Sequence, residues 1–168
     1  MRRKRWPIAA LTIALSFLAL PSHETPRRAA SAAKPQDAQA GAPIDAIGHW
    51  HGFWVAPDGW SYEADMQIHA GLADNVTADI TWTLRAAPDS ATAYQGKTGM
   101  TGVEHAKGTF LPGCAVVKME GVSLDDPNTI LGMDKYRLVL SDDGTTLGGI
   151  TWDHGAWDAE FMAKRQAN

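Results

Sequence analysis

Tryptophan is the residue type best suited to recognition chemistry in this chain, and six of its seven tryptophans follow residue 47. Five of these six stand beside a predicted turn or loop, within runs that alternate apolar and polar residues. A tryptophan ring offers a broad apolar face and one N–H donor, so several rings together can stack on a ligand and orient it. The five are Trp54, Trp60, Trp82, Trp152 and Trp157.

The other candidates for a ligand site are one further aromatic residue in a predicted strand and several residues of two long loops. Carboxylates at the mouth of a pocket can orient a ligand that aromatic rings hold. The segment Asp125-Asp126-Pro127-Asn128 is also typical of a capped turn, so its polar side chains have a structural alternative. These candidates are Tyr62, Tyr94, Gln95, Lys97, Asp125, Asp126 and Asn128.

Glu104 is the one charged residue that strand alternation places inside the fold, between Gly102 and Ala106. A carboxyl group removed from water has a raised pKa, which makes Glu104 a candidate pocket carboxylate. The neighbouring Val103 favours the opposite alternation, and a bulge in this Gly-rich strand would turn Glu104 outward. Both orientations stay open at this point.

Metal-binding and catalytic motifs find no support in the sequence. His49 and His51 project from one face of a predicted strand, but that face is outward, and surface histidines with cross-strand partners explain them. The loop aspartates lack the spacing of a calcium site. Cys114 follows a tight turn, and no Gly-x-Ser-x-Gly motif occurs. We therefore expect neither a cofactor nor a metal, and a binding protein rather than an enzyme.

Period-two alternation predicts the elements that carry these residues, as in Trp60 to Ile68, where apolar residues occupy every second position. Such a pattern is typical of antiparallel strands with one buried face. Eight short strands joined by hairpins favour an all-β, eight-stranded antiparallel up-and-down barrel, which closes and leaves no exposed edge. The expected strands are 47–55, 60–68, 75–85, 99–110, 115–122, 134–140, 146–152 and 157–164.

Turn chemistry predicts the register of the first hairpin. Pro57-Asp58-Gly59 suits a three-residue loop ending in a left-handed glycine. This loop pairs residues whose numbers sum to 116, so we expect Trp54 opposite Tyr62.

Two later hairpins have turn sequences that predict their registers as well. Asp142-Asp143-Gly144 predicts a second three-residue loop, which pairs Tyr136 with Ile150. A two-residue loop in the last hairpin places Trp152 opposite Trp157. With these registers all five tryptophans face inward at one rim of the barrel.

Loop lengths distinguish the two ends of the predicted barrel. The connections at the rim with the tryptophans include the long loops 86–98 and 123–133, and long loops on a small scaffold commonly carry binding sites. A ligand pocket there implies a cavity of about 300 Å³ or more between these loops. The alternative is that the tryptophans fill a barrel only wide enough for its own side chains.

The start of the chain resembles an export signal. Four basic residues at positions 2–5 precede an apolar run over 6–20, which predicts a signal peptide in residues 1–20, or an anchor if it stays uncleaved. Residues 21–46 are rich in Ala, Pro and Ser and predict a disordered tether without barrel contacts. The barrel domain is expected over 47–168, in the periplasm or secreted, with membrane association only through an uncleaved anchor.

The net charge of the predicted folded part argues against one class of partner. From residue 35 onward the chain has 8 Lys and Arg residues against 18 Asp and Glu residues, a balance of −10. This acidic balance argues against nucleic-acid binding. We expect a small apolar or sugar-like ligand at the rim. A protein-interaction module, such as a protease inhibitor acting through the rim loops, is the alternative.

Gly48-His49-Trp50 resembles the Gly-x-Trp signature of the calycin barrels, which include the lipocalins and avidins. The likeness is to small bacterial members of avidin size and implies a ligand site at the open rim. The loop Ala56 to Gly59 lacks the Asn and Ser residues with which avidins bind the biotin ureido group, so biotin is not expected. The long first loop and the disulfides common in lipocalins are also missing.

Overall fold

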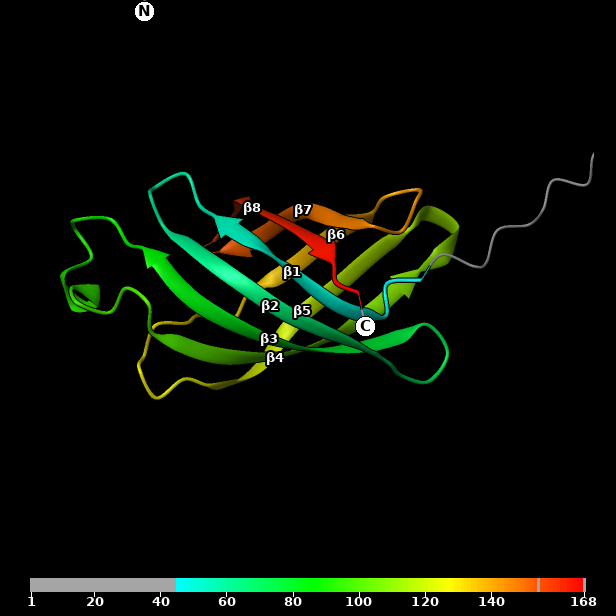
Figure 1. Ribbon diagram of the computed structural model, residues 1–168, viewed down its shortest axis with the longest axis horizontal. Coiled ribbons are helices and arrows are strands. Elements are labelled where there is room, and N and C mark those ends of the chain that lie inside the picture. The colour runs from blue at the N-terminus through cyan, green and yellow to red at the C-terminus, as the bar shows by residue number, and fades with distance from the viewer. Residues whose placement is uncertain (1–44, 154, 168) are drawn as a thin grey trace, which may run out of the picture. The chain divides into compact units, whose positions relative to one another are not determined.

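The computed structural model describes residues 45–153 and 155–167, which form a closed barrel of eight antiparallel strands (Figure 1). Each strand pairs with its neighbours in sequence, and β1 closes the barrel on β8, so the predicted up-and-down fold is confirmed. No helix in this part of the chain is long and apolar enough to cross a bilayer. The strands are β1 (Gly48–Val55), β2 (Ser61–Ala70), β3 (Asn75–Ala86), β4 (Thr101–Leu111), β5 (Val116–Asp125), β6 (Lys135–Leu140), β7 (Thr146–Asp153) and β8 (Ala156–Arg165).

The interior of the barrel is filled by every second residue of each strand. In β3 the buried positions run from Val76 through Ile80 to Leu84, and the residues between them face outward. This alternation follows from the pleat, because successive side chains of a strand point to opposite faces. The largest fully buried side chains include Trp50, Met66, Ile68, Tyr136, Leu138, Leu147 and Phe161.

The first hairpin has the predicted register. Trp54 pairs with Tyr62, and the loop closes with a hydrogen bond from the Ala56 N–H to the Trp60 carbonyl oxygen at 3.0 Å. Gly59 has φ +101°, a left-handed conformation that favours glycine. The register predicted from the turn sequence is therefore confirmed for the first two strands.

The predicted register of the β6–β7 hairpin is wrong by one residue, because Tyr136 pairs with Thr151 and not with Ile150. The loop contains one residue more than predicted, since Asp143 Oδ1 accepts hydrogen bonds from the backbone N–H and the hydroxyl of Thr145. A shift of one residue exchanges the two faces of a strand. Thr151 is therefore buried and Ile150 is exposed.

Two of the five tryptophans face outward, which corrects their predicted place in the site. The predicted pairing of Trp152 with Trp157 is also wrong, because the β7–β8 register shifts between Thr151 and Asp153. Trp152 pairs with Lys135 across β6 and β7, and the lysine Nζ lies 4.7 Å from its ring centroid. Trp157 follows a register irregularity in the β7–β8 pairing, is 43 % exposed and lies beneath the guanidinium of Arg137.

The barrel domain begins earlier than residue 47. Ala46 is fully buried, and its carbonyl oxygen accepts a hydrogen bond from Trp50 Nε1 at 3.0 Å. Arg165 donates to the carbonyl oxygens of Asp45 and Ile47. Residues 45 and 46 are thus part of the fold, which corrects the end of the predicted tether 21–46. The predicted signal 1–20 and the remainder of that tether lie outside the described residues.

Candidate functional site

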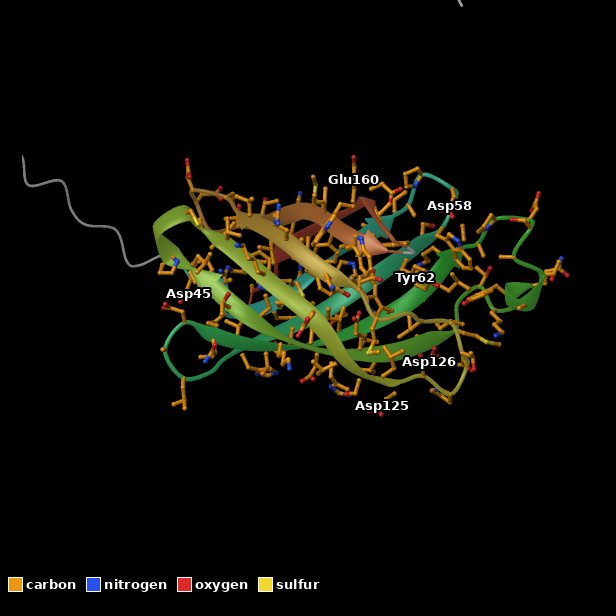
Figure 2. The ribbon with its side chains drawn as sticks, turned by 180° about the vertical axis from the view of Figure 1, so that it is seen from behind. Asp45, Asp58, Tyr62, Asp125, Asp126 and Glu160 are labelled. Carbon is orange, nitrogen blue, oxygen red and sulfur yellow. The ribbon has the colours of Figure 1, made fainter. Side chains whose placement is uncertain are left out.

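A cavity of about 160 Å³ lies at the rim that carries the longer loops. Figure 2 shows Tyr62 toward the end of the barrel that carries Asp58 and Asp126, whereas Asp45 marks the other end. The position matches the prediction, but the volume is about half of that expected. A cavity of about 150 Å³ still holds a benzene-sized ligand. Its lining residues are Trp54, Trp60, Tyr62, Trp82, Tyr94, Glu104, Ile130, Leu131, Gly132 and Asp134.

Aromatic rings form one continuous wall of this cavity. Tyr62 is central, with Trp54 and Trp82 edge-on to it at centroid distances of 5.6 and 6.1 Å. Trp60 lies nearly parallel to Tyr62, and Tyr94 stands edge-on to Trp60 at 4.5 Å. Edge-on contacts are favourable because the positive ring edge meets a negative face. The wall is therefore a packed unit to which β1, β2, β3 and the loops β1–β2 and β3–β4 all contribute.

The polar atoms of the three buried rings of the wall, those of Trp54, Tyr62 and Trp82, are hydrogen-bonded within the protein. Trp54 Nε1 donates to Thr151 Oγ1 at 2.7 Å, and the Tyr62 hydroxyl donates to the Ile130 carbonyl oxygen at 2.6 Å. The first bond depends on the corrected β7 register, which brings Thr151 inside. Because these groups have partners, what the rings chiefly offer a ligand is their apolar surface.

Glu104 faces inward from β4 and is 1 % exposed, so the first of the two orientations considered is confirmed. Its Oε2 accepts hydrogen bonds from the Tyr136 hydroxyl and from Trp82 Nε1, and its Oε1 accepts one from the Asp134 backbone N–H. Burial raises the pKa of the Glu104 carboxyl, and these hydrogen bonds oppose part of the rise. Position 121 must be a glycine for Glu104 to lie here, because a Cβ at Gly121 would collide with Glu104 Oε1.

The raised pKa of Glu104 predicts a pH dependence of stability. The folded form holds the proton to higher pH than the unfolded form, whose glutamate titrates near about 4.3. Its contribution to stability is thus complete below that pH and is lost as the pH rises through the folded pKa. The quantity to follow is the difference in unfolding free energy between the wild type and Glu104→Gln. We expect this difference to fall as the pH rises from the unfolded to the folded pKa of Glu104, and to stay constant at higher pH. Urea unfolding of both proteins across pH tests this, and a difference that rises with pH contradicts it.

The loop between β5 and β6 is organised by Asp126, as the capped-turn interpretation predicted. Asp126 Oδ2 accepts the backbone N–H groups of Ile130 and Leu131 at 2.6 and 2.7 Å. These bonds hold the loop so that both apolar side chains line the cavity. Lys97 Nζ donates to the carbonyl oxygens of Asn128 and Thr129, which ties this loop to the one between β3 and β4.

Six of the predicted site residues line the cavity, namely Trp54, Trp60, Tyr62, Trp82, Tyr94 and Glu104. Four do not. Trp152 and Trp157 lie on the outer wall, and Asp125 ends β5 facing outward, 3.1 Å from His105. Asp126 does not line the cavity either, but its carboxylate holds the β5–β6 loop through the Ile130 and Leu131 N–H groups. The residues that the sequence reasoning missed are Ile130, Leu131, Gly132 and Asp134. Two apolar residues in succession within a long loop were the available signal.

The histidines of the outer wall pair with carboxylates across strands. His49 lies 2.7 Å from Asp65, and His105 lies between Asp79 and Asp125. Hydrogen bonds to Asp125 and then Asp79 raise the pKa of His105, which is exposed. Among the described residues no group of three or more His, Cys, Asp or Glu side chains is arranged to hold a metal ion.

Comparison with protein-family models, with curated proteins and with solved structures gives no match for this chain. The site must therefore be interpreted from its own geometry. Its lining is aromatic and acidic, and no Ser, Cys or His is among the described residues that form it. Its aromatic rings can stack on a small molecule, and its carboxylates can orient that molecule.

Proposed function

We propose that this chain is an exported binding protein that holds a small ligand in the rim cavity. The observation that carries the proposal is the cavity of about 160 Å³ between five aromatic side chains and one buried carboxylate. Taking a carboxylate out of water costs free energy, and a barrel that served only as a packed scaffold could fill the position of Glu104 with an apolar side chain. A buried ionisable group in a cavity is instead typical of a functional site.

The barrel closure, the Gly48-His49-Trp50 segment at the first strand and the rim position of the cavity support a calycin-like relationship as part of the proposal. The basic residues and apolar run at the start of the sequence support export to the periplasm or beyond. The cavity volume restricts the ligand to about the size of a benzene ring, or to one group of a larger molecule.

Binding of small probes to two matched variants tests the function. Indole, phenol, glucose and tetramethylammonium are titrated into the wild type, with tryptophan fluorescence and melting temperature as readouts. We expect at least one probe to bind, and Trp60→Ala to weaken that binding roughly tenfold because its ring lines the cavity. Trp157→Ala removes a tryptophan from the outer wall and should leave the affinity unchanged. Binding that depends on Trp157 and not on Trp60 contradicts the proposal.

A row of exposed apolar side chains favours protein contact as a second candidate function. Val139 is 52 % exposed, Met162 64 % and Phe53 54 %. They lie side by side, because Gly148 pairs with both Val139 and Met162, and Met162 also pairs with Phe53. Contiguous exposed apolar surface often marks an interaction site.

In this second candidate function the contact surface is the barrel wall and not the rim loops, whose Ile130 and Leu131 line the cavity. Self-association is the protein contact that can be measured without knowing a partner. Sedimentation of the wild type should then show a dimer that Met162→Glu abolishes, and a monomer at all concentrations argues against self-association.

A further inference from the structure

The rim cavity is lined by acidic residues and by no basic ones. Glu104 and Asp134 contribute to its lining, whereas no Lys, Arg or His is among the described residues that form it. Lys97 Nζ lies 5.1 Å from the Tyr94 ring centroid, but it donates hydrogen bonds to two backbone carbonyl oxygens and does not line the cavity. The cavity therefore favours positive charge electrostatically.

Glu104 receives only neutral donors from the protein. They are one phenol, one indole and one backbone N–H. A carboxylate offers about four acceptor sites, so these donors leave room for one more. Within residues 45–153 and 155–167 no ion pair involves Glu104. A buried carboxylate without a counter-charge is costly, and a cationic ligand would remove that cost.

The aromatic wall is suited to the same kind of ligand. The faces of Trp and Tyr rings attract cations within about 6 Å of the ring centroid, most strongly where water is excluded. Trp60 and Tyr94 stand almost perpendicular to one another, at an interplanar angle of 79°, so they present faces in different directions. Tyr62 and Trp82 are also nearly perpendicular, at 75°. A charged group among these rings would meet more than one face.

Resting on the proposed binding function, we infer that the ligand is a small organic cation, whose ammonium group lies among the rings and takes Glu104 as its counter-charge. The volume of about 160 Å³ suits a methylated ammonium group or a short primary amine. A larger amine would enter with its charged end first and leave the rest at the open rim.

The test compares two probes of the same shape and different charge. Choline carries a quaternary ammonium, and 3,3-dimethylbutan-1-ol replaces its nitrogen with carbon. Calorimetric titration of the wild type with both should show choline binding at least about tenfold more tightly. This comparison needs no variant, so it does not depend on how a substitution affects folding.

A matched pair of variants then assigns the effect to one carboxylate. Glu104→Gln should weaken choline binding about tenfold or more. Glu160→Gln makes the same change at an exposed position of β8, labelled in Figure 2, and should have no effect. Choline affinity of the wild type should rise with pH as Glu104 ionises, and Glu104→Gln should lose most of this dependence. Tyr136 and Asp134 are the other titratable residues at Glu104 and stay in place in both proteins.

The outcomes separate this inference from the proposed function. Equal binding of choline and its neutral analogue overturns the inference and leaves the cavity as a binding site. An unchanged choline affinity in Glu104→Gln overturns the role of the carboxylate. If neither these two probes nor indole, phenol, glucose or tetramethylammonium binds, the proposed function falls together with the inference.

Discussion

Replacing Trp82 with alanine should lower the free energy of unfolding by about 4 kcal/mol or more. The side chain is 4 % exposed, and its ring packs edge-on against Tyr62 and Phe161. Removing a buried aromatic ring costs about 3–5 kcal/mol through lost apolar burial and the cavity left behind. The loss of the indole N–H also leaves Glu104 Oε2 with one donor fewer, which costs about 1–3 kcal/mol more.

Urea unfolding of three variants checks this prediction and divides its causes. Trp82→Phe keeps most of the ring and removes the donor, so it should cost only about 1–3 kcal/mol. Trp157→Ala removes a partly exposed ring from the outer wall and should cost about 1 kcal/mol or less. If Trp82→Ala is no more damaging than Trp157→Ala, Trp82 is not the support of the aromatic wall described above.

Replacing Gly108 with alanine should cost about 3 kcal/mol although it adds a single methyl group. A Cβ at this position in β4 would collide with the backbone carbonyl oxygen of Lys118 in β5. Gly108 pairs with Met119, so the two strands cannot separate there without loss of sheet hydrogen bonds. Overpacking against backbone is costlier than overpacking against a flexible side chain, which can move aside.

Gly113→Ala is the matched control, because a Cβ at Gly113 would meet nothing within 4 Å. We expect its unfolding free energy to stay within about 0.5 kcal/mol of the wild type. Similar losses in both variants would show that backbone entropy, and not the close approach of β4 and β5, decides the effect at Gly108.

The strands and the first register could be predicted from the sequence because two local signals agree there. Alternation places Trp54 and Tyr62 on the inner face, and the turn at Pro57-Asp58-Gly59 pairs them with each other. The same alternation favoured an inward Glu104, but Val103 and the glycines of this strand left an outward orientation open. Its partners Tyr136 and Trp82 come from β6 and β3, and only the closed barrel brings these side chains to one point.

The β6–β7 hairpin shows where local reasoning failed. Asp142-Asp143-Gly144 looked like the first turn, but the hydrogen bonds of Asp143 draw Thr145 into the loop. This one residue exchanges the faces of β7, so that Thr151 reaches Trp54 and Trp152 lies outside. The choice depends on a side-chain hydrogen bond that hydrophobic alternation does not represent.

The cavity volume depends on loop conformation, which has no periodic signal in the sequence. Asp126 fixes the loop so that Ile130 and Leu131 fill part of the rim, and this accounts for a space smaller than the roughly 300 Å³ expected of a typical pocket.

The most direct test of the rim cavity as a binding site follows the indole N–H signals of the chain in proton–nitrogen correlation spectra during titration with choline and the other probes. A ligand in the cavity should shift the signals of Trp54, Trp60 and Trp82, which line it. The signals of Trp50, bound to Ala46 deep in the barrel, and of Trp157 on the outer wall should stay in place. Shifts confined to Trp157, or no shift with any probe, would contradict a binding site in the rim cavity.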